Sequence, residues 1–348
     1  MFFVLQFLSY LSVLFVFLPM VKSDFWIFRS LEYSRFQNFI VSIIIIFLWV
    51  ISYFYFHEID YTALILNIIC LIYLCIKIIP YTIFFKKEVK SIKSINPDRE
   101  IKFVNANVLQ HNTQYERLKV QLKQYNPDVI LLLETDQKWK LQMEYLKKDY
   151  PFFIEVPKEN TYGMLFYSKL KIKEEQIHYL VKDEIPSISC KLFLVDNYEI
   201  KLWGLHPEPP VPGENLYSTA KDKELAKVAL DVKDNGLANI VMGDLNDVAW
   251  SDTTSLFTKT SGLLDVRKGR GFYSTFSAHH WFIKFPLDYI FCSPHFGFIK
   301  MKRLKFNGSD HYPIFTHLVY MPSLKTQQKR EIDTENVKEA VEKANQEV

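Results

Sequence analysis

Residues 127–134 have the sequence Pro-Asp-Val-Ile-Leu-Leu-Leu-Glu, in which an unbroken run of large apolar residues ends in a carboxylate. Such a run predicts a central strand, 129–133, that is buried on both faces. A polar side chain at the end of a buried strand costs folding energy unless it is paired or binds an ion. Three more polar clusters follow or lie in apolar runs of this kind: Gly243-Asp244-Leu245-Asn246, Leu287-Asp288-Tyr289-Ile290-Phe291 and Gly308-Ser309-Asp310-His311. Four such clusters indicate groups that converge on one site.

The size and charge of the chain limit the classes of protein it can be. With 348 residues, a formal net charge of +3 and 49% hydrophobic residues, it is long enough for one large domain plus accessory segments. The near-balanced charge gives no support to a strongly basic nucleic-acid binder. The four cysteines, Cys70, Cys75, Cys190 and Cys292, lack CxxC spacing and are interpreted as buried thiols. Neither a disulfide framework nor a zinc site is predicted.

The first 85 residues are predicted to be a membrane region. Three apolar runs, at about 1–20, 39–56 and 61–85, are each near the ~20 residues that a helix needs to cross a bilayer core of about 30 Å. The sequence therefore predicts three transmembrane helices. The alternative for the first run is a cleaved signal peptide, but it has no basic N-terminal region and no Ala-x-Ala site.

The charges that flank these runs predict their orientation. The connection 57–60 carries no Lys or Arg, whereas the connection 22–38 and the exit of the third run are basic. Positive flanks stay on the cytoplasmic side, so the large C-terminal domain is predicted to be cytoplasmic. The residues that carry this argument are Lys22, Arg29, Arg35, Lys86, Lys87, Lys90 and Lys93. Trp26, Phe28 and Tyr33 are interpreted as anchors in the membrane interface.

The rest of the chain divides into a basic linker (86–100), a soluble domain (101–320) and a polar tail (321–348). The tail has little to bury and is expected to be a solvated helix or disordered. Short strands alternate with amphipathic helices in the soluble domain, which suggests two sheets packed face to face with helices outside. The expected strands are 101–108, 129–133, 164–167, 188–195, 199–205, 239–242, 286–292 and 313–319, and the expected helices are 115–125 and 222–232.

The order of the polar residues resembles that of the endonuclease/exonuclease/phosphatase superfamily. The matching positions are Asn107, Glu134, His206, Asp244-x-Asn246, Asp288 and Ser309-Asp310-His311. The superfamily includes pancreatic-type deoxyribonucleases, abasic-site endonucleases, neutral sphingomyelinases and inositol polyphosphate 5-phosphatases. The resemblance covers about 101–320, and the three apolar runs ahead of it resemble the membrane-anchored bacterial branch. It implies a four-layer α/β sandwich, an active site at one edge of the two sheets, and an integral protein of the bacterial plasma membrane.

The resemblance also implies a bound divalent metal, Mg²⁺ or Mn²⁺. A hard cation held by carboxylates neutralises the charge of a phosphate ester and stabilises the leaving oxygen. Glu134 is expected to be the principal ligand, with Asn107 and Asp310 completing the set. Asn105 lies two residues from Asn107 and would face the same side of the strand, but Asn107-Val-Leu matches the first motif of the family.

The remaining motif residues are expected to act on the substrate. Asp244 orients or deprotonates the attacking water, and Asn246 donates to the developing charge on the phosphoryl oxygens. His311 hydrogen-bonds the scissile phosphate, while Asp288 orients it and favours its imidazolium form. His206 resembles the second histidine of the deoxyribonuclease and sphingomyelinase branches, which binds or protonates a phosphate oxygen.

Together these features predict a membrane-anchored, metal-dependent phosphoesterase that hydrolyses phosphodiester or phosphomonoester bonds by direct water attack. The anchor favours a membrane-proximal substrate such as a phospholipid headgroup. A nuclease acting on DNA or RNA is the second hypothesis, and a catalytically silent membrane scaffold is the third. Two modest basic clusters bear on the second: Arg267, Lys268 and Arg270, and Lys300, Lys302, Arg303 and Lys305. The third would be marked by lost site residues, and all of them are present. The sequence predicts no oligomeric state.

Overall fold

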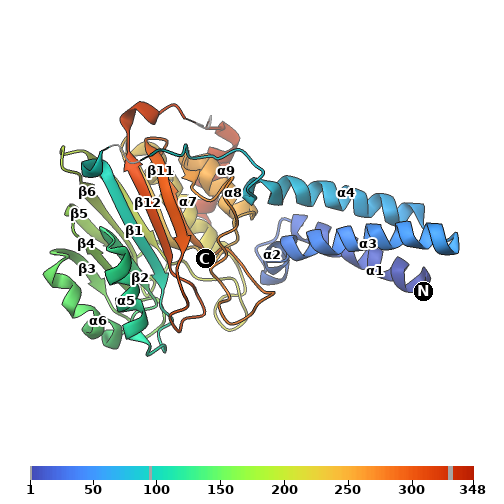
Figure 1. Cartoon of the computed structure of the whole chain (residues 1–348), viewed down its shortest axis with the longest axis horizontal. Coiled ribbons are helices and arrows are strands. Elements are labelled where there is room, and N and C mark those ends of the chain that lie inside the picture. Colours follow the sequence, from blue (N-terminus) through green and yellow to red (C-terminus); the bar gives the residue numbers. More distant parts are fainter. Residues whose placement is uncertain (1, 94–95, 328–331) are drawn as a thin grey trace.

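The strand predicted at 129–133 is the centre of one sheet. In the computed structural model, which describes residues 2–93, 96–327 and 332–348, this strand is β2 (Val129–Leu133), with all five residues buried. It is parallel to β1 (Glu100–Asn107) and antiparallel to β4 (Met164–Ser168). The sheet has the order β11-β12-β1-β2-β4-β3 (Figure 1). Its other strands are β3 (Phe152–Val156), β11 (Phe296–Arg303) and β12 (Ile314–Tyr320).

A second mixed sheet packs against the first. Its order is β5-β6-β7-β8-β10-β9, and the pair β7 and β8 is parallel while the other pairs are antiparallel. The strands are β5 (Lys171–His178), β6 (Ser187–Phe193), β7 (Glu199–Leu205), β8 (Ala238–Asp244), β9 (Leu264–Asp265) and β10 (Asp288–Cys292).

The alternation of side chains along β2 explains why its sequence is apolar throughout. Val129, Leu131 and Leu133 point into the core between the two sheets, where they meet apolar residues of β7, β8 and β10. Ile130 and Leu132 point to the outer face, which α5 (Tyr115–Tyr125) and α6 (Gln137–Met143) cover. The outer face of the second sheet is covered by α7 (Thr219–Asp234) and α8 (Asp252–Ser261). The predicted four-layer α/β sandwich is confirmed.

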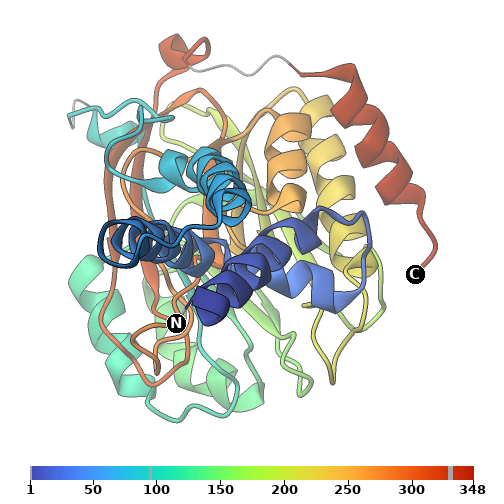
Figure 2. The same ribbon diagram turned by 90° about the vertical axis from the view of Figure 1, so that its right-hand side faces the viewer.

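The C-terminal tail contains a helix that packs on the domain. This helix, α9 (Thr334–Asn345), lies against α7 and α8 (Figure 2). Ala340 is fully buried in that contact, and Lys343 forms an ion pair of 2.9 Å with Asp222 of α7. Of the two alternatives expected for the tail, the helix is observed over these residues, and one face of it is buried.

Three long apolar helices precede the domain and project from one end of it (Figure 1). They are α1 (Phe2–Phe17), α3 (Arg35–Phe56) and α4 (Tyr61–Ile78), and a short helix, α2 (Trp26–Tyr33), lies between the first two. The third apolar helix ends before residue 85, because Pro80 lies in a 3₁₀ turn, η2 (Ile79–Tyr81), that closes it. Further 3₁₀ turns are η1 (Leu18–Met20), η3 (Pro97–Arg99), η4 (Glu144–Lys148) and η5 (Pro322–Leu324).

The three-helix bundle has apolar side chains on its outside and polar groups inside, the distribution expected in an apolar environment. Large apolar side chains such as Phe3 and Phe47 are exposed on its outside. Polar groups face inward instead, where the indole of Trp49 donates to Ser9 Oγ at 2.9 Å and the amide of Asn67 donates to the Ser9 carbonyl at 3.3 Å. Small and polar residues between helices, with apolar residues outside, are typical of helices packed in a membrane.

The segment predicted to be a basic linker is partly bound to the domain. Ile92 N–H donates to the Phe298 carbonyl at 2.8 Å, and Phe298 N–H donates to the Lys90 carbonyl at 2.9 Å, so residues 90–92 lie along β11. Val89 is fully buried in the core between the sheets. Residues 89–92 of the connecting segment are therefore packed on the domain.

Candidate active site

Strand direction brings the predicted site residues to one edge of the sandwich. β1 and β2 are parallel, as are β7 and β8, so their C-terminal ends lie at the same edge of each sheet. β10 and β12 are antiparallel to their neighbours and begin at that edge. The polar residues at these strand ends are Asn107, Glu134, His206, Asp244, Asp288, Asp310 and His311. A hydrogen bond of 3.1 Å between Asn107 and Asp244 joins the two sheets there.

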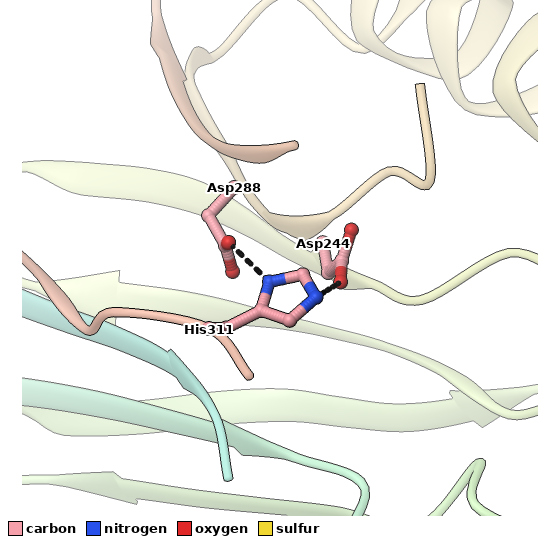
Figure 3. Close-up of side chains that lie close together, drawn as sticks. All are labelled: Asp244, Asp288 and His311. Atoms are coloured by element: carbon pink, nitrogen blue, oxygen red, sulfur yellow. Dashed lines mark hydrogen bonds and ion pairs between the residues drawn. The ribbon is translucent and has the colours of Figure 1, made fainter. Parts of the chain in front are cut away.

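His311 lies between two buried carboxylates (Figure 3). Its Nδ1 is 2.8 Å from Asp288 Oδ2, and its Nε2 is 3.5 Å from Asp244 Oδ2. Asp244 and Asp288 are direct cross-strand partners on β8 and β10. Two like charges in that position repel each other, so the imidazole between them offsets a repulsion that the strand register creates.

These contacts set the charge of His311. Burial lowers the pKa of His311, but Asp244 and Asp288 raise it by more, to about 10. The imidazole is therefore a cation at neutral pH and can donate from both nitrogens. Burial raises the pKa of Asp244, although His311 opposes the shift. A raised pKa makes Asp244 a better proton acceptor than an exposed aspartate.

Asn107 links the carboxylates of the two sheets. Its side-chain amide donates to Glu134 Oε1 at 2.6 Å and to Asp244 Oδ2 at 3.1 Å, and its Oδ1 accepts from Leu109 N–H at 3.1 Å. Burial raises the pKa of Glu134 to about 7, even though the hydrogen bond from Asn107 lowers it. Asp310 is half-buried near the same group and adds to the negative charge that acts on Glu134. The structure thus puts two of the predicted metal ligands, Asn107 and Glu134, in direct contact, and places Asp310 where its charge acts on Glu134.

The charge balance of the site fits a divalent cation. Four carboxylates, Glu134, Asp244, Asp288 and Asp310, surround the imidazolium of His311. Glu134, with a pKa of about 7, is partly protonated at neutral pH, but the other three still outnumber the one positive charge. Carboxylate oxygens are the ligands that Mg²⁺ and Mn²⁺ prefer. Asp244, Asp288 and His311 have ligand atoms within 4.8 Å of one another. His311 is nonetheless a poor ligand, because an imidazolium has no lone pair to give.

Two other predicted residues, Asn246 and His206, border this cluster. Asn246 N–H donates to Asp244 Oδ1 at 2.9 Å, while its side-chain amide donates to the Pro207 carbonyl at 3.0 Å. His206 is buried beside the ring of Tyr162, with a centroid distance of 5.3 Å, and its Nδ1 has no hydrogen-bond partner among the described residues. Burial lowers the pKa of His206 to about 4, so this imidazole is neutral at neutral pH.

The backbone around the site adopts uncommon conformations. Glu134 and Asn246 have φ angles of 59° and 48°, in the left-handed region that non-glycine residues rarely occupy. Strain of this kind is concentrated at functional sites, where the surrounding structure enforces it. Gly243 has a different reason to be glycine, since a Cβ there would lie 1.9 Å from the Leu205 carbonyl oxygen on β7.

Several residues that support the site had no role predicted from the sequence, although Ser309 lies in a motif that was recognised there. Asn105, considered only as a competitor of Asn107, donates to Asp288 Oδ1 at 3.4 Å, so both asparagines of β1 face the cluster. Ser309 Oγ donates to the Asn107 carbonyl at 2.9 Å and accepts from His311 N–H at 3.0 Å. Strand alternation identifies Asn105, and the position of Ser309 inside its motif identifies that residue. Tyr162 has no motif that marks it.

The comparisons with known proteins agree with this geometry. Residues 104–311 match the sequence model of the Endonuclease/Exonuclease/phosphatase family. The chain belongs to this family, whose members are divalent-metal-dependent hydrolases that act on phosphoester bonds. No curated protein matches the chain by sequence.

Solved structures share the fold at low identity. TDP2 from D. rerio, in complex with a single-stranded DNA product, is 17% identical, with a TM-score of 0.54 over 63% of this chain and 98% of that one. A family protein from Bacteroides thetaiotaomicron is 19% identical, with a TM-score of 0.51 over 64% and 98%. The human Nocturnin catalytic domain with bound sulfate is 17% identical, with a TM-score of 0.52 over 64% and 94%.

Proposed function

We propose that this protein is a membrane-anchored phosphoesterase that uses Mg²⁺ or Mn²⁺ and hydrolyses its substrate by direct attack of water. The observation that carries the proposal is the continuous set of contacts from Glu134 through Asn107 to Asp244, His311 and Asp288. Two buried carboxylates, Asp244 and Asp288, with the half-buried Glu134 and Asp310 beside them, cost folding energy unless a bound charge stabilises them.

Each residue has a role that its surroundings support. Glu134, Asp310 and the Asn107 side chain would hold the metal, which supplies positive charge to the phosphate oxygens. Asp244, with a pKa raised by burial, accepts the proton of the attacking water. His311, held as a cation by Asp244 and Asp288, donates to a phosphoryl oxygen. The neutral imidazole of His206 lines the same place, and the Asn246 amide adds a further donor once it leaves the Pro207 carbonyl.

The rim of the site supports a substrate with an apolar part, such as a phospholipid. The loop 207–217 adjoins Asn246, and the loop 276–285 adjoins His311 through Phe276, whose ring lies 5.0 Å from the imidazole. Both loops carry exposed apolar side chains, namely Leu216, Tyr217, Trp281 and Phe282. Trp26 N–H of α2 donates to the Leu216 carbonyl, and Tyr33 at the other end of α2 packs on Phe285. An apolar rim beside the membrane region suits a substrate that is partly held in the bilayer.

Nucleic acid is the second candidate substrate, favoured by the DNA product held by D. rerio TDP2. One of the two basic clusters does not support it. Arg267 is fully buried in an ion pair of 2.8 Å with Asp265, and Arg270 donates to Val89 and Ser91 of the connecting segment. In the second cluster, Lys300 and Lys302 are exposed on β11, a strand at the edge of the sheet, and Lys305 is exposed just after it. Charges on an edge strand commonly prevent edge pairing.

The test is hydrolysis by the full-length protein in detergent, with Mn²⁺ or Mg²⁺. We expect Asp244→Ala and His311→Ala each to lower the rate at least about 100-fold while the protein keeps its fold. Asp234→Ala, an exposed carboxylate on α7, should match the wild type. Phospholipids in mixed micelles, single-stranded DNA and a generic phosphodiester are compared as substrates. Wild-type rates in the Asp244 and His311 variants would refute the assignment, and preference for DNA would move it to the second candidate.

A further inference from the structure

The segment that follows the Gly-Asp-Leu-Asn motif, residues 246–250, is held by side chains from the membrane region. The Tyr33 hydroxyl, at the end of α2, donates to the Asn246 carbonyl at 2.6 Å. The Arg35 guanidinium, at the start of α3, donates to the Trp250 carbonyl at 2.5 Å. The Tyr81 hydroxyl, at the end of η2, donates to the Ala249 carbonyl. Three backbone acceptors of one catalytic-domain loop are thus bound by residues that precede the domain.

Packing and a returning hydrogen bond reinforce these contacts. The Trp250 indole donates to the Glu32 carbonyl at 2.8 Å, and Glu32 forms a buried ion pair of 3.1 Å with Arg35. Ile78 and Tyr81 of the membrane region share an apolar cluster with Val248, Ala249, Trp250 and Leu287 of the domain. The contact between the membrane region and the loop 246–250 buries both charged and apolar groups. Burial of this kind is typical of a specific packed interface and not of a loose contact between two surfaces.

The domain itself provides two contacts near the middle of the same loop. Tyr289 Oη donates to the Asp247 carbonyl at 2.9 Å, and Lys221 forms a buried ion pair of 2.9 Å with the Asp247 carboxylate. Lys221 also reaches the Asn246 carbonyl, at 3.5 Å, but the Tyr33 hydroxyl is much closer to that oxygen, at 2.6 Å, and makes the stronger hydrogen bond. Asn246 has a left-handed backbone, and its own N–H donates to Asp244 Oδ1. The orientation of the Asn246 peptide groups therefore bears directly on the carboxylate that is proposed to be the base.

We propose that Tyr33 is a positioning residue for catalysis, and that the membrane region forms part of the active-site scaffold instead of serving only as an anchor. Tyr33 acts through the Asn246 backbone: it fixes the peptide that follows Asn246, and this holds the Asn246 N–H against Asp244. Tyr81 and Arg35 hold the rest of the loop in the same way. This inference rests on the proposed role of Asp244 in hydrolysis.

The experiment compares single-atom changes in the full-length protein purified in detergent. Tyr33→Phe removes the hydroxyl and keeps the ring that packs on Phe285 at 5.4 Å. Tyr53→Phe is the matched control, because Tyr53 is exposed on α3, well along that helix from the domain. With a soluble phosphodiester, bis(p-nitrophenyl) phosphate, and Mn²⁺, we expect Tyr33→Phe to lower kcat roughly tenfold, the effect of one lost hydrogen bond. KM and the unfolding temperature should stay near those of the wild type.

Tyr81→Phe gives a second, independent test. Its contact lies at Ala249, farther along the loop from Asp244, so we expect a smaller fall in kcat in the same direction. If Tyr33→Phe does not fold, the kcat of Tyr81→Phe tests whether the membrane region positions the loop. Wild-type kcat in the variants that fold, or an equal loss in Tyr53→Phe, overturns the inference, and so does a change confined to KM or to thermal stability.

The outcomes separate this inference from the proposed function. If Asp244→Ala keeps wild-type hydrolysis, the proposed function itself is wrong. If Asp244→Ala abolishes hydrolysis and Tyr33→Phe has the kcat of the wild type, the function stands and the positioning role is refuted.

Discussion

His311 shows how one side chain can both stabilise a strand pair and prepare a site for chemistry. The register of β8 and β10 sets Asp244 opposite Asp288, and the imidazolium between them compensates two buried carboxylates. Removing the imidazole leaves those charges facing each other without a partner, which costs several kcal/mol. A His311 variant is therefore expected to lose stability because Asp244 and Asp288 face each other in the sheet, and this loss is separate from its effect on catalysis.

The pairing makes a prediction about pH. Burial lowers the pKa of His311, but Asp244 and Asp288 hold it at about 10, so the cation persists until the pH rises through that value. This pKa lies above the unfolded value of about 6.5, so the ion pairing also stabilises the folded state. That stabilisation is fully present below about pH 6.5 and is lost as the pH rises through about 10. Asp288→Asn removes one of the two charges. We expect its activity to decline at a pH at least about one unit lower than in the wild type.

The measurement is the pH profile of kcat/KM with a soluble phosphodiester. Asp196→Asn, an exposed carboxylate paired with Arg99 at 2.7 Å, is the control and should keep the wild-type profile. An alkaline limb that is the same in Asp288→Asn and in the wild type would show that Asp288 does not keep His311 protonated.

At the scale of the elements, the sequence predicted the buried strands well and the exposed ones poorly. β2, β7 and α5 were predicted with the bounds that the structure has, because their apolar patterns are continuous or regular. β5 was missed, since Lys-Ile-Lys-Glu-Glu-Gln-Ile-His is an edge strand whose side chains are mostly exposed. α8 was also missed, because its threonine-rich sequence has low helix propensity and packing against the second sheet decides its conformation.

The same contrast applies to the site. Strand-end motifs located the acidic residues, since their spacing follows from the fold of the family. Tyr33 was interpreted as an interfacial anchor, but it hydrogen-bonds Asn246, which is 213 residues away in the sequence. A contact of this kind depends on how the bundle and the domain pack, and no local pattern in the sequence encodes it.

The helix α9 supports a prediction about stability. Ala340 is fully buried where α9 packs on α7 and α8, so Ala340→Glu forces a larger, charged side chain into this contact, beside the Asp222 carboxylate. We expect a loss of about 1–3 kcal/mol in the free energy of unfolding and faster hydrogen exchange across 334–345. Glu342→Gln, on the exposed side of α9, is the control. Unchanged exchange in Ala340→Glu would mean that α9 does not pack as described.

At the scale of the whole molecule, the basic residues that predict orientation fall into two groups. Arg29 and Arg35 are engaged with the domain, since Arg29 forms an ion pair of 3.5 Å with Asp222 and Arg35 donates to the Trp250 carbonyl at 2.5 Å. Lys22, Lys86 and Lys87 are exposed beside the bundle. These lysines are on the domain side of the three apolar helices, which is the arrangement that the positive-inside rule assigns to the cytoplasm.

Thiol labelling in intact cells tests this orientation. A membrane-impermeant maleimide should label His57→Cys, in the connection at the far end of the bundle, and should label Lys259→Cys in the domain only after the cells are opened. Both variants are made in a background with Cys75→Ser, because the other native cysteines, Cys70, Cys190 and Cys292, are buried. Labelling of Lys259→Cys in intact cells would place the domain on the outer side.

The contacts of Lys343 with Asp222, and of Gln346 with Asp24, have a consequence for biosynthesis. Asp24 and Gln346 are 322 positions apart, and their side chains are 3.3 Å from each other. A translating ribosome exposes Asp24 long before Gln346 has been made. The three apolar helices are therefore synthesised while this corner of the molecule is still open, and it closes only after α9 has left the exit tunnel.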